Sequence, residues 1–254
     1  GTDVSKEAAD IVLADDNFAS IVAAVEEGRA IFSNIRKFLR YLLSSNMGEV
    51  MTMFFGVLLA DAIGLVPAEG GAVALPLLAT QILWINLVTD GAPALALGAD
   101  AADAGVMTMP PRPKGEGVIT RRMWWGIFYV GTIMAAGTLL VLDASLPGGL
   151  IEGKGDVRYA QTMAFNTLVL FSLFTAFNAR SDEQSAFAGL FSNKWLWAAV
   201  VLSLLLQAAV IYTPFLQQAF STVSLSAGDW MHCAAVASSV LWLRELSKLL
   251  ARAR

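Results

Sequence analysis

The sequence predicts an all-α polytopic membrane protein with six transmembrane helices and a short α/β tail at its N-terminus. Of its 254 residues, 56% are hydrophobic and only 15% are charged, and the mean hydropathy is +0.61. A typical soluble domain carries about 25% charged residues. A bilayer span needs roughly 20 apolar helical residues. Six stretches meet that requirement, near 41–63, 76–98, 122–143, 158–178, 195–214 and 229–248.

Residues 1–17 are predicted to be the tail of a cytosolic α/β domain. The segment from Ser5 to Asp10 is typical of a short helix, and Ile11–Leu13 of a buried strand that ends in a turn. Such a tail is too short to fold by itself. The chain begins at Gly1 without the pattern of a signal or transit peptide, so we interpret it as part of a longer protein.

Residues 18–63 are predicted to form a long stalk that continues into the first transmembrane helix. Asp16 and Asn17 are both good N-caps, and apolar residues then recur at helical spacing with no proline before Pro67. A continuous helix of this kind would be ~64 Å long at ~1.5 Å per residue, about twice the hydrocarbon thickness. The alternative is two helices broken at Gly28, although one glycine costs only ~1 kcal/mol.

An aspartate lies inside the apolar run of residues 76–98. Burying the bare charge of Asp90 in lipid would cost roughly 2.5–3.5 kcal/mol. Asn86, Thr89 and Asp90 face one side of a helix. Pro93 removes a backbone donor, which frees main-chain carbonyls at the level of the aspartate. The sequence therefore predicts a broken helix with a polar notch that binds an ion.

A second buried acid lies in the first span. Asn46 and Glu49 share a helix face, and Gly48 between them lets another helix approach closely. Two carboxylates can balance one divalent cation, and oxygen donors without sulfur or imidazole favour calcium, or manganese, over zinc, copper or magnesium. The alternative is that Asn46 only links helices and that Glu49 is a protonated acid. The candidate metal ligands are Asn46, Glu49, Asn86, Thr89 and Asp90.

The rest of the chain is predicted to complete the membrane domain. Residues 99–121 are expected to be a cytosolic loop, residues 122–248 four further transmembrane helices, and residues 249–254 a cytosolic tail. All Lys and Arg residues except Lys154 and Arg158 fall on one side of this topology. The positive-inside rule then makes that side, with both termini, cytosolic.

Composition also excludes some partners. The net charge of −4 and the lack of a basic cluster give no reason to expect nucleic acid binding. The single cysteine, Cys233, allows no intrachain disulfide. Its neighbour His232 is the only histidine, so we interpret the pair as packing residues rather than a zinc site, which needs three or four ligands.

Five segments of the sequence carry recognisable motifs, namely Gly1–Phe18, Glu26–Arg29, Ser44–Glu49, Leu83–Gly91 and Pro110–Arg112. Together they resemble the C-terminal part of type II P-type cation-transporting ATPases, similar to the calcium pumps of the sarcoplasmic reticulum kind. The likeness is specific over residues 1–120, and beyond them it depends mostly on hydropathy and on Gln161–Phe165.

In that family, the resemblance implies, ATP phosphorylates an aspartate in a cytosolic domain, and the domain movements switch ion sites between the two membrane faces. Residues 18–60 then resemble the family's fifth membrane helix and residues 76–98 the sixth, so the six spans are helices five to ten. The resemblance also implies ion ligands, with Asp90 bridging two sites where two exist. They are Asn46 and Glu49 on the fifth helix, and Asn86, Thr89 and Asp90 on the sixth.

The chain departs from the two-calcium pumps at one position. Their eighth helix supplies a glutamate, where this sequence has Ser172. Either one ion is carried, or a second binds with a weaker ligand set in which Ser172 takes part. The resemblance also places the ATP and Mg²⁺ sites, and four further membrane helices with a glutamate ligand, in an N-terminal half of the pump outside this chain.

The leading hypothesis is the membrane ion-binding part of an ATP-driven calcium pump. Pumps for manganese, sodium or protons in the same family are alternatives. A passive cation channel or a secondary transporter is an alternative of another class, although the duplicated broken helices common in secondary transporters are missing. A third alternative is a partner or assembly module. Short loops and many alanines favour a prokaryotic plasma membrane.

Overall fold

The computed structural model describes residues 2–15, 17–65, 73–101, 105–113, 115–181, 185–187 and 189–252. Helices make up its regular structure, and these residues form no strand. In chain order the helices are α1 (Asp3–Glu7), α2 (Phe18–Leu58), α3 (Ala79–Trp84), the π-helix η1 (Ile85–Thr89), α4 (Gly91–Gly98), α5 (Arg121–Asp143), α6 (Val157–Asn178), α7 (Lys194–Tyr212), α8 (Pro214–Phe220) and α9 (Ala227–Arg252).

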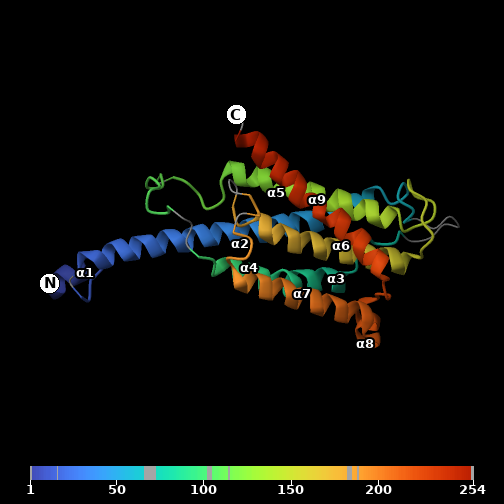
Figure 1. Cartoon of the computed structure of the whole chain (residues 1–254), viewed down its shortest axis with the longest axis horizontal. Helices are drawn as coiled ribbons and strands as arrows, with labels where there is room; N and C mark the ends of the chain where they lie inside the picture. The colour runs from blue at the N-terminus through green and yellow to red at the C-terminus, as the bar shows by residue number, and fades with distance from the viewer. Residues whose placement is uncertain are drawn as a thin grey trace.

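The helices form a bundle around the second half of α2 (Figure 1). Helix α2 packs against α5, α6 and α4, while α6 packs against α5 and α9, and α4 against α7. The first half of α2 projects from the bundle and carries α1 near its tip (Figure 1). The second half of α2 therefore lies between α3–α4 on one side and α5 and α6 on the other.

Helix α2 is continuous over 41 residues, which is ~62 Å at ~1.5 Å per residue. It begins at the predicted place, where the side chain of Asn17 accepts a hydrogen bond from the N–H of Ala19 at 3.0 Å. Asp16, the other predicted cap, lies outside the described residues. The helix runs through Gly28, so the alternative of two helices broken there is wrong, and it ends at Leu58 rather than at residue 63.

The N-terminal tail differs from the prediction. Its helix spans Asp3–Glu7 instead of residues 5–10. Residues 11–13 are not a buried strand, because they form no ladder and Ile11 and Val12 are 73% and 51% exposed. A strand is held by a neighbouring strand and by apolar cover, and the described part of this chain supplies neither.

Within the part of the chain that the structure describes, three helices are long and apolar enough to cross a membrane, namely α5, α6 and α7. They coincide with the predicted spans at 122–143, 158–178 and 195–214. The other predicted spans lie in α2, in α3–η1–α4 and in α9. These helices are either less apolar or shorter than α5, α6 and α7. Polar residues around Glu49 lower the hydropathy of α2, and the pieces between Ala79 and Gly98 are each shorter than a span.

Two glycines let α2 and α5 pack backbone to backbone. A Cβ added to Gly131 of α5 would lie 2.6 Å from Cγ of Met47 on α2. A Cβ added to Gly48 of α2 would lie 2.9 Å from Cβ of Met134 on α5. Small residues at helix contacts in membranes allow this close approach, which gives the dispersion energy that holds such helices together. The position of Glu49 is fixed by this contact, one residue away.

A buried polar cluster, the Asp100 cluster, joins four segments at the end of the bundle from which the stalk projects. One carboxylate oxygen of Asp100 lies 3.2 Å from Nζ of Lys37 on α2 and 3.3 Å from Nε of Arg180 after α6. The other accepts a hydrogen bond from the amide of Asn193, before α7, at 3.0 Å. The Asn34 amide of α2 donates to the Asp100 carbonyl at 2.6 Å. The cluster fixes the stalk against the end of α4.

The glycine contacts predict opposite effects of two identical substitutions. Gly28→Ala should stabilise the protein by ~1 kcal/mol, because Gly28 is exposed in mid-helix with nothing within 4 Å of an added Cβ. Gly131→Ala should destabilise it by roughly 1–3 kcal/mol through overpacking against Met47. Thermal unfolding in detergent, followed by tryptophan fluorescence, measures both. Equal shifts of the two variants in the same direction would contradict the described packing.

The Asp100 cluster predicts a large cost for losing its carboxylate. Asp100→Asn should destabilise the protein by roughly 3–5 kcal/mol, because the buried Lys37 and the partly buried Arg180 both lose the carboxylate that they contact. Glu116→Gln is the matched control, since Glu116 pairs with Arg36 at 2.7 Å but is partly exposed, and such pairs contribute roughly 0–1 kcal/mol. Chemical unfolding of the purified variants compares them, and similar losses would argue against a structural role of the cluster.

Candidate functional site

One face of α2 carries three buried polar side chains at four-residue spacing. Tyr41, Ser45 and Glu49 therefore stand above one another along the helix. We call this row the α2 polar stripe. Its hydrogen bonds lead to α6 and to the segment between α3 and α4. The stripe is the part of the stalk helix that meets the predicted ion-binding segment.

The segment that carries Asp90 is interrupted at the same level. The N–H of Asp90 bonds the carbonyl of Ile85 at 2.8 Å, five residues back, which is the π-helical pattern. Pro93 has no N–H for the carbonyl of Thr89, its partner in a regular helix. The hydroxyl of Ser203 on α7 lies 3.4 Å from that carbonyl instead. The break therefore leaves backbone oxygen at the level of the aspartate.

Both acids are buried, and only one oxygen of each carboxylate accepts a hydrogen bond from the described residues. Glu49 is 4% exposed and Asp90 is 0% exposed. The Asn86 amide donates to Oε2 of Glu49 at 2.6 Å, and the Tyr41 hydroxyl donates to Oδ1 of Asp90 at 2.9 Å. The other oxygens, Oε1 of Glu49 and Oδ2 of Asp90, have no hydrogen-bond partner among the described residues. The two carboxyl groups are close enough to interact electrostatically.

These oxygens fit a hard cation. A buried carboxylate oxygen without a partner is costly, and a cation or a proton removes that cost. Carboxylate, amide and carbonyl oxygens are the donors that calcium takes. Among the described residues, no three or more His, Cys, Asp or Glu side chains are grouped so that they could hold a metal ion. The donors around the two acids are amide and hydroxyl groups, whereas zinc and copper prefer Cys and His ligands.

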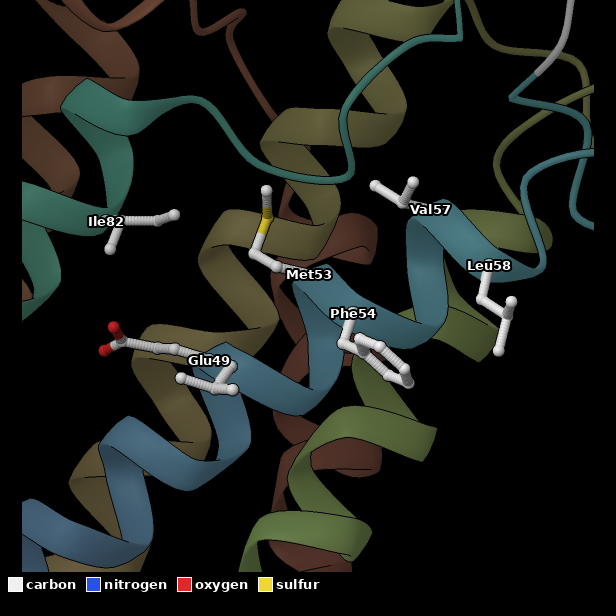
Figure 2. A pocket seen from close by; sticks show the side chains of 7 residues that line it. Glu49, Met53, Phe54, Val57, Leu58 and Ile82 are labelled. Atoms are coloured by element: carbon white, nitrogen blue, oxygen red, sulfur yellow. The ribbon is translucent and has the colours of Figure 1, made fainter.

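Glu49 also borders an open groove. Figure 2 shows its side chain extending from α2 toward the segment that carries Ile82. The groove has a volume of about 530 Å³. Apart from Glu49 its lining is apolar and consists of Val50, Met53, Phe54, Val57, Leu58 and Ile82. The Glu49 carboxylate thus lies where the buried polar groups meet this apolar groove.

The structure brings together some of the predicted ligands and not others. Glu49 and Asn86 are in contact, and Asp90 is close enough to Glu49 to interact with it electrostatically. Thr89 is buried, but its hydroxyl donates to the carbonyl of Ile85 at 3.0 Å. Asn46 is half-buried, and its amide donates to the carbonyl of Leu42 in its own helix at 2.9 Å. In these positions neither the hydroxyl of Thr89 nor the amide N–H of Asn46 donates a hydrogen bond to Glu49 or Asp90.

Ser172, the position of the missing glutamate, lies in the same region. It is fully buried on α6, and its hydroxyl is 2.6 Å from the hydroxyl of Ser45 on α2. Both hydroxyls interact with the carboxylate of Asp90. Ser172 therefore belongs to the shell around Asp90, and its hydrogen-bonding capacity is shared with Ser45.

Sequence reasoning missed Tyr41 as a partner of Asp90, and Ser203 beside the Thr89 carbonyl. The signal for Tyr41 is present, because residues 41, 45 and 49 repeat at the spacing of one helix face. Ser203 lies in a long apolar run more than 100 residues from Thr89, and a lone serine there gives no local signal.

Comparison with known proteins gives consistent matches. Residues 74–250 match the family described as "Cation transporting ATPase, C-terminus". The chain is 45% identical over 91% of its length to the "Calcium-transporting ATPase" of Bacillus subtilis (strain 168). It is 40% identical over its whole length to "Calcium-transporting ATPase 1" of Yarrowia lipolytica, and 39% identical to "Calcium-transporting ATPase type 2C member 2" of Mus musculus.

The chain spans only about a quarter of the length of these relatives, 24% of the first and 26% of the other two. The family match covers most of the bundle, and the three apolar helices α5, α6 and α7 lie inside it. The chain is therefore an integral membrane protein that belongs to the cation-transporting ATPases, as the C-terminal part of a type II P-type ATPase.

Proposed function

We propose that this chain forms the ion-binding membrane part of an ATP-driven calcium pump. The observation that carries the proposal is a pair of buried carboxylates on two helices, each with one oxygen that lacks a partner among the described residues. The relatives at 39–45% identity are named calcium-transporting ATPases, which supports calcium as the transported ion. Calcium is here the cargo of the protein.

The proposed ligands are Asn46, Glu49, Asn86, Thr89 and Asp90. A calcium ion between α2 and the interrupted segment would meet two negative charges and the oxygen of the Asn86 amide, which now contacts Glu49. Thr89 and Asn46 now hydrogen bond to carbonyls of their own helices. They would join the ligand set by rotating their side chains away from those carbonyls. The site is thus assembled by side-chain motion around two fixed acids.

The stalk supplies a mechanical link to the site. Arg29 on α2 donates to the carbonyls of Val106 and Met109 at 2.9 and 2.8 Å, so the 99–121 loop is tied to the stalk. A movement of the stalk reaches Glu49 through one continuous helix. We propose that ATP and Mg²⁺ bind in the N-terminal half of the same pump, and that phosphorylation there moves α2. The apolar groove beside Glu49 is the proposed contact surface for membrane helices of that half.

The proposed topology has six spans in the lipid bilayer and both termini in the cytosol. The location of nearly all Lys and Arg residues on one side of the predicted spans supports it. The interrupted segment and α2 would be the spans that carry polar groups, as ion pathways require. A prokaryotic plasma membrane is the proposed location, in keeping with the similarity to the Bacillus subtilis protein.

Other cargoes and another class of transport remain alternatives. A manganese, sodium or proton pump would use the same two acids, and ATPase assays with each ion in turn separate these cases. A passive channel or a secondary transporter would move calcium into proteoliposomes without ATP. Flux that needs no ATP would decide for that class.

The shell around Asp90 supports a single transported ion. A second site would need another anionic ligand, and α6 offers the hydroxyl of Ser172, which is already bonded to Ser45. The hydroxyl of Tyr41 also occupies one oxygen of Asp90. One divalent cation matches the two carboxylates in charge.

Loss of either acid should abolish calcium stimulation. In the full-length protein, Glu49→Gln and Asp90→Asn should each weaken the calcium dependence of ATP hydrolysis by at least about a hundredfold, because the loss of a residue that only orients a metal ligand already costs about 10–100-fold in metal affinity. Asp61→Asn is the control, since Asp61 is an exposed carboxylate just beyond the same helix. The proposal fails if the two site variants keep the calcium dependence of the control.

The single-ion proposal predicts simple binding. Equilibrium binding of radioactive calcium to the full-length protein should saturate at one ion per molecule and without cooperativity. Ser172→Ala should leave that stoichiometry unchanged, because Ser172 is bonded to Ser45 rather than reserved for an ion. Two ions bound by the unchanged protein, falling to one in Ser172→Ala, would show instead that Ser172 is a ligand.

A further inference from the structure

Helix α7 carries only two polar side chains in its apolar middle, and both are fully buried. Between residues 198 and 211 they are Ser203 and Gln207. They are four residues apart, so they lie on one face of the helix. Other faces of α7 are open, since Leu202 and Leu205 are 49% and 65% exposed. Polar groups in the middle of a membrane helix need partners within the protein, so the role of this face follows from what it contacts.

The polar face of α7 contacts α3, η1 and α4, which together form the interrupted segment of residues 79–98. The hydroxyl of Ser203 lies 3.4 Å from the carbonyl of Thr89, the last residue of η1. The indole N–H of Trp84, the residue before η1, donates to Oε1 of Gln207 at 3.1 Å. The two stretches run antiparallel, and α7 therefore contacts the interrupted segment at both ends of its π-helix.

A third contact lies near the end of the same segment. The amide of Asn193, just before α7, donates to the carbonyl of Ala96 in α4 at 3.0 Å. Where a membrane helix is broken or ends, its free carbonyls are satisfied by polar groups of neighbouring helices. Asn193 and Ser203 both reach such carbonyls. Helix α7 therefore supplies polar contacts along most of the interrupted segment.

Gln207 and Trp84 are themselves held by other elements. Nε2 of Gln207 lies 3.5 Å from Oδ1 of Asn166, which is fully buried on α6. The ring of Trp84 packs edge-on against that of Phe220 in α8, with the centroids 5.0 Å apart. Gln81, three residues before Trp84, donates to the carbonyl of Phe220 at 3.1 Å. The bond between Trp84 and Gln207 therefore joins the interrupted segment to α6, α7 and α8.

The stalk helix contacts the interrupted segment from another side. In Figure 1, α3 and α4 lie between α2 and α7, and α4 contacts both helices. The bonds on the α2 side run from Tyr41 to Asp90 and from Asn86 to Glu49. A movement of α2 changes the distances between these groups only if the interrupted segment does not follow α2. The contacts with α7 provide the required fixed support.

We propose that Gln207 is a positioning residue for calcium binding, and that together with Ser203 it holds the interrupted segment against α7 while α2 moves. The inference rests on the proposed function, because the groups that it positions, Asn86 and Asp90, are proposed ligands of the pump. Gln207 acts through Trp84 and Ser203 through the Thr89 carbonyl, so neither contacts the ion.

The test measures the calcium dependence of ATP hydrolysis by full-length protein with Gln207→Met. Methionine has a similar length but cannot accept the bond from Trp84 in the same way. The calcium concentration for half-maximal activity should rise at least about tenfold, because the loss of a residue that orients a metal ligand costs about 10–100-fold in affinity. The rate at saturating calcium should stay unchanged, since only binding is weakened.

Two further variants test the same contacts. Trp84→Phe removes the indole N–H, and combined with Gln207→Met it should add little to the effect of Gln207→Met, because both remove one bond. Ser203→Ala should raise the half-maximal calcium concentration about fivefold, the effect of one ordinary hydrogen bond. This mild change keeps the proposal testable if Gln207→Met does not fold.

Gln161→Met is the matched control. Gln161 is a buried glutamine of α6 whose amide donates to the carbonyl of Leu75 at 2.7 Å, outside the interrupted segment. Its loss should lower the thermal stability of the protein and leave the half-maximal calcium concentration unchanged. A merely structural role of Gln207 would instead make the two glutamine variants behave alike.

Hydrogen–deuterium exchange without calcium separates this inference from the pump proposal. Backbone amides of residues 79–98 should exchange faster in Gln207→Met than in Gln161→Met. If the unchanged protein shows no calcium-stimulated hydrolysis, the pump proposal fails, and this comparison alone decides whether α7 holds the segment. The inference is overturned by equal exchange in the two variants, by an equal rise of the half-maximal calcium concentration in both, or by no rise in Gln207→Met and Ser203→Ala.

Discussion

The burial of two carboxylates on neighbouring helices is the constraint on which the rest of the structure depends. Asp90 and Glu49 lie within the bundle, and each keeps an oxygen without a partner among the described residues. The surroundings offset this cost with Tyr41, Asn86 and the paired hydroxyls of Ser45 and Ser172. Packing elsewhere is close enough to hold these groups in place, as the contact of Gly48 with α5 illustrates.

The sequence predicts the long helix and the interruption of the helix near Asp90 well, because both depend on local rules. The continuity of α2 follows from helical periodicity and the lack of proline, and the interruption near Asp90 follows from Pro93. The failed strand at residues 11–13 has the opposite cause. An apolar triplet becomes a strand only beside another strand, which is information that the triplet itself does not contain.

The partners of the acids are harder to predict than the acids. Glu49 and Asp90 stand out because a charge inside an apolar run is unusual. The serine that reaches Asp90 from α6 and the one that approaches the Thr89 carbonyl from α7 are found only when the helices are packed. The amide of Asn46 likewise bonds to the carbonyl of Leu42 in its own helix instead of turning toward the acids. The number of oxygen-bearing side chains in the sequence does not predict this choice.

The α2 polar stripe has a consequence for how the stalk could act. Tyr41, Ser45 and Glu49 lie on one continuous helix. A rotation of α2 about its own axis therefore displaces all three side chains together and in the same direction. At the outer radius of a helix, a twist of about 20° moves a side-chain tip by about 2 Å. That distance is enough to separate a hydrogen-bonded pair. A small torsion applied far out on the stalk can therefore disengage the tyrosine from Asp90 and the glutamate from Asn86 in a single step.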